Sequence, residues 1–309
     1  MEDQRIEILL ASYNGAAYIR QQIDSIMAQT EGDWRLVFSD DGSADGTAEI
    51  LDAYVRQYPD RMTRVHSGRR FGNARDHFFW LMKQSAAEIM FFCDQDDVWR
   101  PDKMQKMKAA MEQAQRQYGE KTPLLVFSDQ IVTDDQLQVI SPSLMDYQRQ
   151  FSAHFDYRSI LMQNVVTGGA MAINRALAQK AALCADETSA MMHDWWLAAV
   201  AARFGRIVYL DEALGAYRQH GDNSVGAKNV RSLRYVMEKL KKLPQLRALM
   251  LKKKAQADVF RETFDQELTP EDQRFLLGYA KSHSSLKFYW TYRAQIHGWM
   301  RWLGGWILG

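Results

Sequence analysis

Three carboxylates, those of Asp94, Asp96 and Asp97, stand within four residues at the end of an apolar run. Charges this close repel one another, and a hard divalent cation with oxygen ligands, Mg²⁺ or Mn²⁺, serves all three as a shared partner. Such ions usually keep coordination positions open for substrate phosphates. The spacing therefore predicts a divalent metal site, and a solvated acidic turn is the alternative.

The segments on either side place these acids in a strand-to-helix loop. Residues 89–92 are apolar and predict a buried strand, and Pro101 opens a helical segment rich in Lys and Met. Ligands of open α/β sheets bind at the carboxyl ends of strands. The position of the acids therefore suits chemistry as well as their composition does.

Two strand-loop-helix units precede this loop. Residues 6–10 and 34–38 predict strands, and helices follow each of them, over residues 19–27 and 47–58. Alternating units of this length predict a parallel sheet with helices on its faces.

The loops of these two units are expected to lie side by side at the carboxyl edge of the sheet. Tyr13 in the first loop is placed to stack on a nucleotide base, and Asp41 in the second to accept hydrogen bonds from the imide of that base. Asp and Gly are also favoured in tight loops for turn formation and helix capping, so this alternative stays open.

Other nucleotide and metal motifs are excluded. Residues 41–46 match the start of an EF-hand calcium loop, but the twelfth position is Asp52 instead of the bidentate Glu, and the flank is strand-like. No G-x-G-x-x-G pattern follows either strand, and no P-loop pattern occurs, so neither a dinucleotide-binding domain nor a P-loop enzyme is supported.

The composition is that of an ordinary soluble globular chain: 309 residues, 47% apolar and 25% charged. The two cysteines, Cys93 and Cys184, have no metal-ligand spacing, so we expect no disulfide and a reducing compartment. We expect no signal peptide, and no run of eighteen apolar residues predicts a membrane span. A cytoplasmic location follows as an expectation.

The net charge of +1 conceals an asymmetry between two parts of the chain. From Lys228 to the end, 16 Lys and Arg face 7 Asp and Glu, which gives +9, and residues 1–227 carry the balance of −8. A Gly-rich polar stretch, residues 221–226, separates the two parts. We therefore predict a catalytic domain over residues 1–226 and a basic, Trp-rich helical region over residues 227–309.

Taken together, the motifs resemble the family 2 glycosyltransferases of GT-A fold, and most of all bacterial enzymes that add sugars, rhamnose among them, to surface polysaccharides. The resemblance covers roughly residues 5–226 and does not extend into the tail. It implies an α/β fold with a mostly parallel, Rossmann-like sheet flanked by helices, followed by a helical C-terminal appendage. The motifs that carry it are residues 11–15 (ASYNG), 39–47 (SDDGSADGT), 94–99 (DQDDVW) and 101–103 (PDK).

The resemblance implies a donor site for a UDP- or dTDP-linked sugar and a metal site that holds Mg²⁺ or Mn²⁺. Asp94 and Asp96 match the D-x-D pair whose cation bridges the donor diphosphate, Asp97 extends the pair, and His220 meets the diphosphate or the metal. The implied donor-binding residues are Ser12, Tyr13, Asn14, Asp40, Asp41, Asn73, Arg75, Gln95, Arg218 and His220. A solvated basic turn is the alternative for Asn73 and Arg75, and a structural role is the alternative for His220.

Two later segments match the acceptor side of the family pattern. Gly168 and Gly169 precede a small strand that borders the sugar and acceptor, although such a Gly pair also marks a bulge or close packing. Asp194 stands where the family has its general base, at the start of an apolar helix. As an alternative, an acid there is favoured by the helix macrodipole alone.

The implied reaction is a single displacement that inverts the anomeric centre. The cation stabilises the departing diphosphate, and Asp194 takes the proton of the acceptor hydroxyl, which we expect on a growing, lipid-linked polysaccharide. A non-catalytic nucleotide-sugar-binding or scaffolding protein is the alternative. A nucleotidyltransferase is less well supported, because it normally carries a Gly-rich basic loop after the first strand, and residues 12–15 are not one.

The tail pattern allows two interpretations. Ten basic residues lie between Lys228 and Lys254 beside an apolar stripe broken near Pro244, and Trp299, Trp302 and Trp306 follow. Such helices favour the headgroup region of an anionic membrane, which predicts a peripheral location on the inner face of the cell membrane. A helical appendage packed on the catalytic domain is the alternative. Nucleic acid is not expected as a partner, because the acidic main domain opposes a polyanion.

Overall fold

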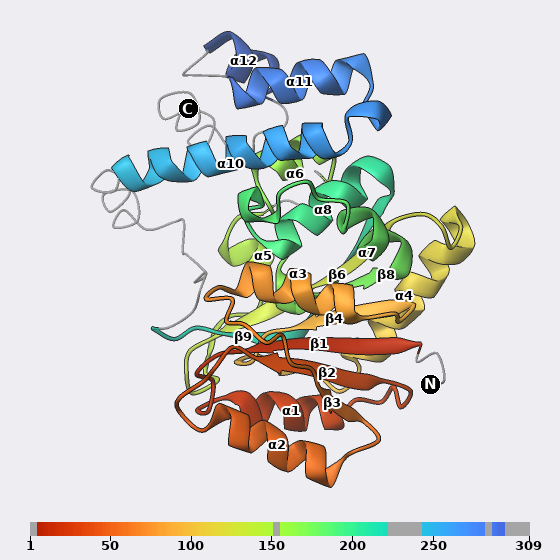
Figure 1. Ribbon diagram of the computed structural model, residues 1–309, viewed down its shortest axis with the longest axis vertical. Coiled ribbons are helices and arrows are strands. Elements are labelled where there is room, and N and C mark those ends of the chain that lie inside the picture. Colours follow the sequence, from red (N-terminus) through yellow and green to blue (C-terminus); the bar gives the residue numbers. More distant parts are fainter. Residues whose placement is uncertain (1–4, 151–154, 222–242, 282–285, 294–309) are drawn as a thin grey trace.

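The computed structural model describes residues 5–150, 155–221, 243–281 and 286–293 of the chain. Within these residues nine strands form one sheet, in the order β3-β2-β1-β4-β8-β6-β9-β5, with β7 pairing with β6. Helices cover both of its faces (Figure 1). The predicted α/β class is therefore confirmed.

Four strands make the parallel half of the sheet: β1 (Ile6–Ser12), β2 (Arg35–Asp40), β3 (Met62–Arg64) and β4 (Ile89–Cys93). β1 lies between β2 and β4 and runs parallel to both. Every residue of β4 is buried, as expected for a parallel strand covered on both faces. The predicted strands stand where the sequence places them, and their carboxyl ends share one edge.

Two helical layers sandwich this sheet and divide the core between them. On one face lie α1 (Ile19–Met27), α2 (Thr47–Gln57) and α4 (Lys103–Tyr118); α1 turns Ile19, Ile23 and Ile26 inward at helical spacing. On the other face lie α3 (Ala74–Gln84), α6 (Tyr157–Met162), α7 (Arg175–Ala181) and α8 (His193–Phe204).

The second half of the sheet is mixed, and it brings the end of the catalytic region back to the acidic loop. β8 (Met171–Asn174) runs antiparallel to β4 and to β6 (Leu124–Thr133), and β9 (Arg206–Arg218) runs parallel to β6. The two-residue strand β5 (Val98–Trp99), which the sequence did not predict, pairs with β9. This pairing sets Asp94, Asp96 and Asp97 beside the carboxyl end of β9.

Short elements complete the catalytic region and shape its loops. The strand β7 (Val139–Ser141) is followed by α5 (Leu144–Tyr147). Two 3-10 turns, η1 (Gly168–Ala170) and η2 (Glu187–Ser189), precede β8 and α8. Each turn therefore leads into an element that carries or borders a predicted site residue.

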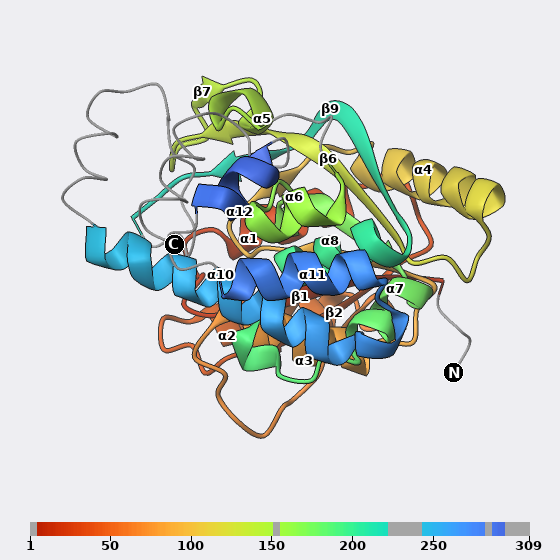
Figure 2. The same ribbon diagram turned by 90° about the horizontal axis from the view of Figure 1, so that it is seen from above.

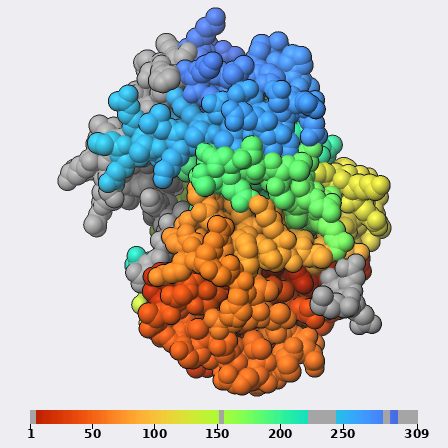
Figure 3. Space-filling view, viewed as in Figure 1, coloured from red at the N-terminus to blue at the C-terminus, as the bar shows by residue number. Residues whose placement is uncertain are grey.

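The described C-terminal helices pack on the catalytic region. They are α10 (Leu243–Thr263) and α11 (Pro270–Ala280), joined by the turn η3 (Asp265–Glu267), and α12 (Leu286–Thr291). Phe260 is fully buried, and its ring centroid lies 5.6 Å from that of Trp196. Figures 1 and 3 show these helices seated over the segment that contains α6 and α8. Figure 2 shows α10 and α11 side by side.

Polar contacts reinforce this packing. Asp272 at the start of α11 accepts hydrogen bonds from Arg203 at 2.7 Å and from the hydroxyl of Tyr157. Lys180 on α7 forms an ion pair with Glu267. The alternative of a packed helical appendage therefore applies to residues 243–281 and 286–293.

Parts of the tail prediction lie outside the described residues. These are most of the basic stretch from Lys228, the proposed boundary near residue 226, and Trp299, Trp302 and Trp306. The division into two domains and the membrane contact thus stay predictions. In the described part of the chain, no helix is long and apolar enough to cross a membrane.

Candidate active site

The acidic loop after β4 is held by residues far along the chain. Asp97 is buried, and its carboxylate accepts hydrogen bonds from the Gln130 side chain at 3.1 Å and from the backbone N–H of Arg218 at 3.3 Å. Asp96 Oδ2 lies 2.7 Å from His220 Nε2. The structure thus brings together the acids, His220 and Arg218, as the resemblance implies.

Burial and crowding make this cluster costly to ionise. Burial raises the pKa of Asp94 to about 7, and the charges of Asp96 and Asp194 add to the shift. Burial, followed by the charges of Asp96 and Asp94, raises the pKa of Asp97 well above its ordinary value. These groups are arranged so that added positive charge stabilises their ionised forms.

The ammonium group of Lys103 supplies positive charge near Asp94 and Asp97. Lys103 is fully buried at the first turn of α4, where its ammonium group donates a hydrogen bond to the Gly169 carbonyl at 2.6 Å and lies 4.1 Å from the Trp99 ring centroid. Burial lowers its pKa to about 8, although the charge of Asp97 opposes the shift. The sequence motif contained Lys103 but assigned it no role.

The donor atoms suit a hard divalent cation, although their arrangement is not preformed for one. Among the residues described, no group of three His, Cys, Asp or Glu side chains is arranged to hold a metal ion. Asp96 and His220 bond to each other. Asp94 and Asp97 both direct a carboxylate oxygen toward Gly169, where a Cβ atom would lie 2.7 and 2.8 Å from them. Carboxylate oxygens are the ligands that Mg²⁺ and Mn²⁺ prefer, so the residues fit such an ion by their chemistry.

The first two loops lie side by side, as predicted, and hydrogen bonds join them. Ser12 Oγ donates to Asp40 Oδ1 at 3.0 Å, and Asp40 also accepts from the backbone N–H groups of Gly42 and Ser43. Asn14, at φ 48°, accepts a hydrogen bond from the backbone N–H of Ala44 at 3.0 Å. Ser12, Asn14 and Asp40 therefore shape the loops.

Tyr13 presents its side chain at the surface of these loops, with 49% of it exposed. The Gln95 amide pairs with the backbone N–H and the carbonyl of Tyr13, each at 2.9 Å, so the acidic loop fixes the position of Tyr13. The Arg70 guanidinium lies 5.2 Å from the Tyr13 ring centroid. Arg70 was not predicted as a site residue, although it stands in the basic turn that was.

Asp41 and the residues predicted from the basic turn, Asn73 and Arg75, bond to groups of the protein itself. Asp41 accepts hydrogen bonds from the backbone N–H groups of Phe71 at 2.6 Å and Gly72 at 2.7 Å. Asn73 caps α3. Arg75 donates to the carbonyls of Thr188 at 2.6 Å and Ala190 at 3.0 Å, so its guanidinium faces η2 and not the two loops. The nucleotide contacts expected of Asp41, Asn73 and Arg75 stay predictions.

The two adjacent glycines, Gly168 and Gly169, pack closely against Asp194 and against the acidic loop. A Cβ atom on Gly168 would lie 3.0 Å from His193 Nε2 and 3.7 Å from the Cβ of Asp194, whereas one on Gly169 would meet Asp94 and Asp97. Burial raises the pKa of Asp194 to about 7, against hydrogen bonds from the backbone of Trp195 and Gly168. Glycines at these positions therefore let Asp194 pack against Gly168, and Asp94 and Asp97 against Gly169.

Two tyrosines in this region were missed. The Tyr18 ring lies 4.6 Å from that of His220 and 4.8 Å from the Arg218 guanidinium, and so it supports both groups. Burial raises the pKa of Tyr217, with contributions from Asp97, Asp94 and Asp96. Tyr217 immediately precedes Arg218, and this adjacency was the signal that the sequence offered.

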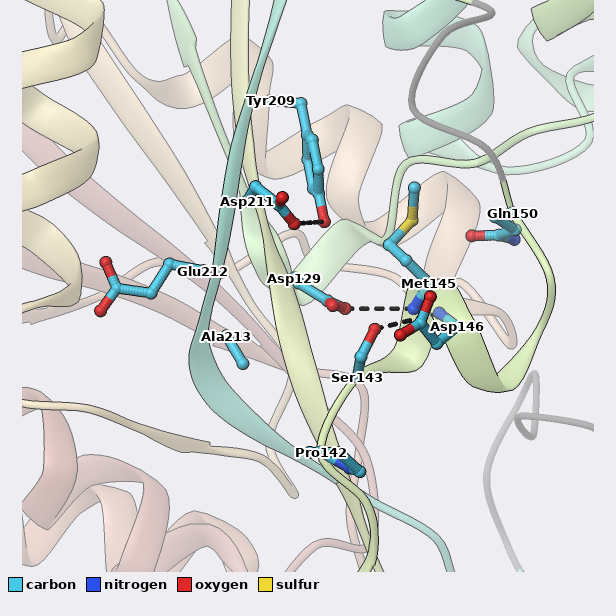
Figure 4. Close-up of a pocket in the computed structure, with 10 residues that line it drawn as sticks. All are labelled: Asp129, Pro142, Ser143, Met145, Asp146, Gln150, Tyr209, Asp211, Glu212 and Ala213. Carbon is cyan, nitrogen blue, oxygen red and sulfur yellow. Dashed lines mark hydrogen bonds between the residues drawn. The ribbon is translucent and has the colours of Figure 1, made fainter.

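A separate cavity of about 420 Å³ lies between β9 and α5 (Figure 4). None of its lining residues is a predicted site residue. Asp129 accepts hydrogen bonds from backbone N–H groups of Leu144 and Met145, and the Tyr209 hydroxyl donates to Asp211. Because these polar groups bond to one another, the cavity does not point to a ligand, and we place the chemistry at the acidic loop.

Comparisons with known proteins agree with this geometry. Residues 7–118 match the model of the family described as glycosyl transferase family 2. The dTDP-rhamnosyl transferase RfbG of Shigella flexneri is 29% identical over 231 residues, which cover 71% of this chain and 74% of that protein. More than a quarter of each chain is unmatched, so the activity of that relative carries over only as a proposal.

Two solved structures share the fold. Residues 1–349 of TarS from S. aureus, in complex with UDP-GlcNAc, superpose with a TM-score of 0.57 at 14% identity, covering 98% of this chain and 90% of that one. The mannosyltransferase PcManGT from Pyrobaculum calidifontis, in complex with GDP-Man and Mn²⁺, gives 0.54 at 17% identity, with 94% and 72% covered. At these identities the likeness shows the fold alone.

Proposed function

We propose that this chain is a family 2 glycosyltransferase of GT-A fold that moves a sugar from a nucleotide-diphosphate donor to a hydroxyl of a growing bacterial surface polysaccharide. One observation carries the proposal. Asp94 and Asp97 of the acidic loop pack against Gly169, Asp194 packs against the adjacent Gly168, and the acidic loop bonds to the first of the two loops proposed to hold the nucleotide. The site thus holds the groups needed at both ends of a glycosyl transfer.

The donor is proposed to be a UDP- or dTDP-linked sugar. The exposed ring of Tyr13, with Arg70 beside it, offers a face on which a base can stack. Gln95 holds the backbone of Tyr13, and Ser12, Asn14 and Asp40 hold the loops around it. The relative named a dTDP-rhamnosyl transferase and the neighbour solved with UDP-GlcNAc support this class of donor.

The diphosphate of the donor is proposed to bind at the acidic loop with Mg²⁺ or Mn²⁺. Asp94, Asp96, Asp97 and His220 would hold the cation, which when bound neutralises charge on the departing diphosphate. Arg218 lies beside them, with its guanidinium bonded to the carbonyl of Asp96 at 2.9 Å. Its positive charge is fixed where the diphosphate leaves, because it also bonds to Asp135 and Gln21.

Asp194 is proposed as the general base. A base works best when its pKa lies near the working pH, and burial brings the pKa of Asp194 to about 7. Its carboxylate takes the proton of the acceptor hydroxyl while that oxygen attacks the anomeric carbon. The acceptor oxygen forms its bond to the anomeric carbon as the bond to the diphosphate breaks, and such a single displacement inverts the anomeric centre.

The acceptor is proposed to be a lipid-linked glycan, which the protein meets as a peripheral protein on the cytoplasmic face of the membrane. The +9 charge from Lys228 onward supports this. The first half of α10 supports it as well, because Leu249 and Leu251 are exposed there.

A panel of nucleotide-sugars tests the proposal directly. The full-length chain should release a nucleotide diphosphate from one of them with Mg²⁺ or Mn²⁺ present and an acceptor glycan added, and EDTA should stop the release. Equilibrium binding of the same donor distinguishes the alternative. A non-catalytic binding protein would bind the nucleotide-sugar and leave it intact under every metal and acceptor condition.

A further inference from the structure

The helix that carries the proposed base begins without a cap of its own. The N-cap residue of α8, Met192, makes no side-chain capping hydrogen bond. The first N–H groups of a helix lack partners inside it, and a side-chain cap normally fixes this end. Asp194 lies in that first turn and its carboxylate accepts a hydrogen bond from the backbone N–H of Trp195 at 2.5 Å, so its position follows the backbone that leads into α8.

The residue that holds this segment comes from the C-terminal helices. Gln256 on α10 is fully buried, and its Oε1 accepts a hydrogen bond from the backbone N–H of Met191 at 2.7 Å. Among the described residues its Nε2 has no hydrogen-bond partner. Burying an amide group costs free energy unless the group is hydrogen-bonded. The hydrogen bond to Met191 offsets part of that cost for Gln256.

The same helix also contacts the residue that follows Asp194. Lys253 lies 5.1 Å from the Trp195 ring centroid and donates to the Met162 carbonyl at 2.9 Å. The Trp195 indole N–H donates to the Ile160 carbonyl at 2.5 Å. In the segment that leads into α8, the Arg75 side chain on α3 donates hydrogen bonds to the carbonyls of Thr188 and Ala190. The turn that carries Asp194 is therefore clamped between α3 and α10.

We propose that Gln256 is a positioning residue for Asp194, and that α10 belongs to the catalytic unit. This inference rests on the proposed role of Asp194 as the base. Gln256 acts through the backbone of Met191, three residues before the base, and does not reach the donor loops. A shift of about 1 Å in a catalytic group costs on the order of 10²-fold in rate, so losing this bond should lower turnover and spare donor binding.

Three variants of the full-length chain test the inference. Gln256→Met removes the acceptor oxygen at similar side-chain length. Gln256→Glu keeps an acceptor oxygen and loses no described hydrogen bond, since Nε2 has none. Gln245→Met makes the same change at an exposed position of α10. The readouts are kcat per donor-binding site, with sites counted by titration with UDP and dTDP, and the KM for the nucleotide-sugar.

We expect Gln256→Met to lower kcat per site by about 10-fold or more, with the donor KM within about twofold of wild type. Gln256→Glu should recover most of that loss, and Gln245→Met should match wild type. Counting sites removes any loss that arises from unfolded protein. Equal losses in Gln256→Met and Gln256→Glu would overturn the inference, because both would then act through packing.

Asp194→Asn separates this inference from the proposed function. If Asp194→Asn is inactive while Gln256→Met turns over at the wild-type rate, the positioning role is wrong and the base assignment stands. If Asp194→Asn keeps the wild-type rate, the base assignment is wrong and the positioning role fails with it.

Discussion

The two sides of the Gly pair are built in different ways. The donor side comprises the loops around Tyr13 and Asp41 and the acidic loop. The loops around Tyr13 and Asp41 are held by side chains that bond to neighbouring loops of consecutive strand-loop-helix units. The base side, meaning Gly168 and the turn around Asp194, is held by Arg75 and Gln256, which come from 115 residues before and 65 residues after the groups that they bind. The two nucleotide loops are therefore held locally, whereas the acidic loop and the base side depend on contacts between distant parts of the chain.

This difference implies that the two sides fail separately. A change on the donor side should remove binding and turnover together, because the donor must be bound before it reacts. A change on the base side should leave donor binding intact and slow the transfer. Substitutions on each side, compared by their effects on donor binding and on turnover, test whether the two sides can be separated.

The largest effect is expected from Asp96→Asn. This carboxylate is proposed to serve the cation, so its loss should abolish metal-dependent donor binding and turnover, with circular dichroism and melting temperature close to wild type. Asp102→Asn is the matched control, since that carboxylate pairs with Arg100 and Lys106 at the surface. Unchanged metal-dependent binding and activity in Asp96→Asn would refute the metal assignment.

Asp194→Asn should have the next largest effect and a different signature. Donor affinity should stay near normal while transfer falls by about 10²-fold or more, the usual scale for a lost general base. Its pH profile supplies a second measure. Asp194 must be ionised to accept a proton, so in the wild type kcat should fall as the pH drops below about 7, and Asp194→Asn should lose this limb. A collapse of donor affinity would move Asp194 to the donor side.

Adjacent glycines offer a sharper test within one turn. In Gly169→Ala the new Cβ would stand 2.7 Å from Asp94 Oδ2 and 2.8 Å from Asp97 Oδ2, so donor binding should weaken by about 10-fold. In Gly168→Ala it would press on the His193 ring at 3.0 Å, so we expect a smaller loss that appears in kcat. Gly32→Ala, with no atom within 4 Å of the new Cβ, is the control. The same kinetic defect in both variants would show that the two sides are not separable.

The same contrast explains what could be predicted from the sequence. The donor-side acids and loops are consecutive motifs that follow apolar strands, and parallel strands bring their carboxyl ends to one edge, so periodicity and motif order were enough to group them. The GT-A resemblance also predicted that Asp96, Arg218 and His220 would meet. The antiparallel pairing of β5 with β9 that brings them together was not visible, because β5 has only two residues.

The residues that hold the base side could not be predicted from the sequence. Asp194 was assigned through the family resemblance, but nothing local indicated that Gln256 or Lys103 mattered. Each is a polar side chain buried by elements distant in sequence, and its partner is a backbone group, which leaves no pattern in residue types. The family resemblance implied that Arg75 contacts the nucleotide, whereas its hydrogen bonds reach η2. Long-range contacts to backbone atoms could not be predicted from the sequence and became visible only in the three-dimensional structure.

The smallest effect is expected at the outer end of α10, where the base side meets the surrounding solution. Leu251 is 54% exposed there, and Trp290 on α12 is 59% exposed. With the +9 charge from Lys228 onward, this end should bind vesicles that contain anionic lipid, each basic residue near the surface contributing on the order of 1 kcal/mol before screening. Co-sedimentation of the full-length chain should rise with anionic lipid content and fall with added salt.

Deleting everything after residue 227 would not test this binding cleanly, because Phe260 and Phe264 belong to the core shared with α8. Substitutions at the surface avoid that problem. Arg247→Gln with Lys252→Gln should reduce co-sedimentation by about 10-fold, whereas Lys121→Gln, an exposed lysine after α4, should not. Turnover on a water-soluble acceptor should be unaffected in both variants, since none of the three substituted side chains reaches the clamp on Asp194.

Equal, negligible binding of the wild-type chain to anionic and neutral vesicles would defeat the membrane prediction. The outer half of α10 would then face solvent or another protein, while its inner half still holds the base.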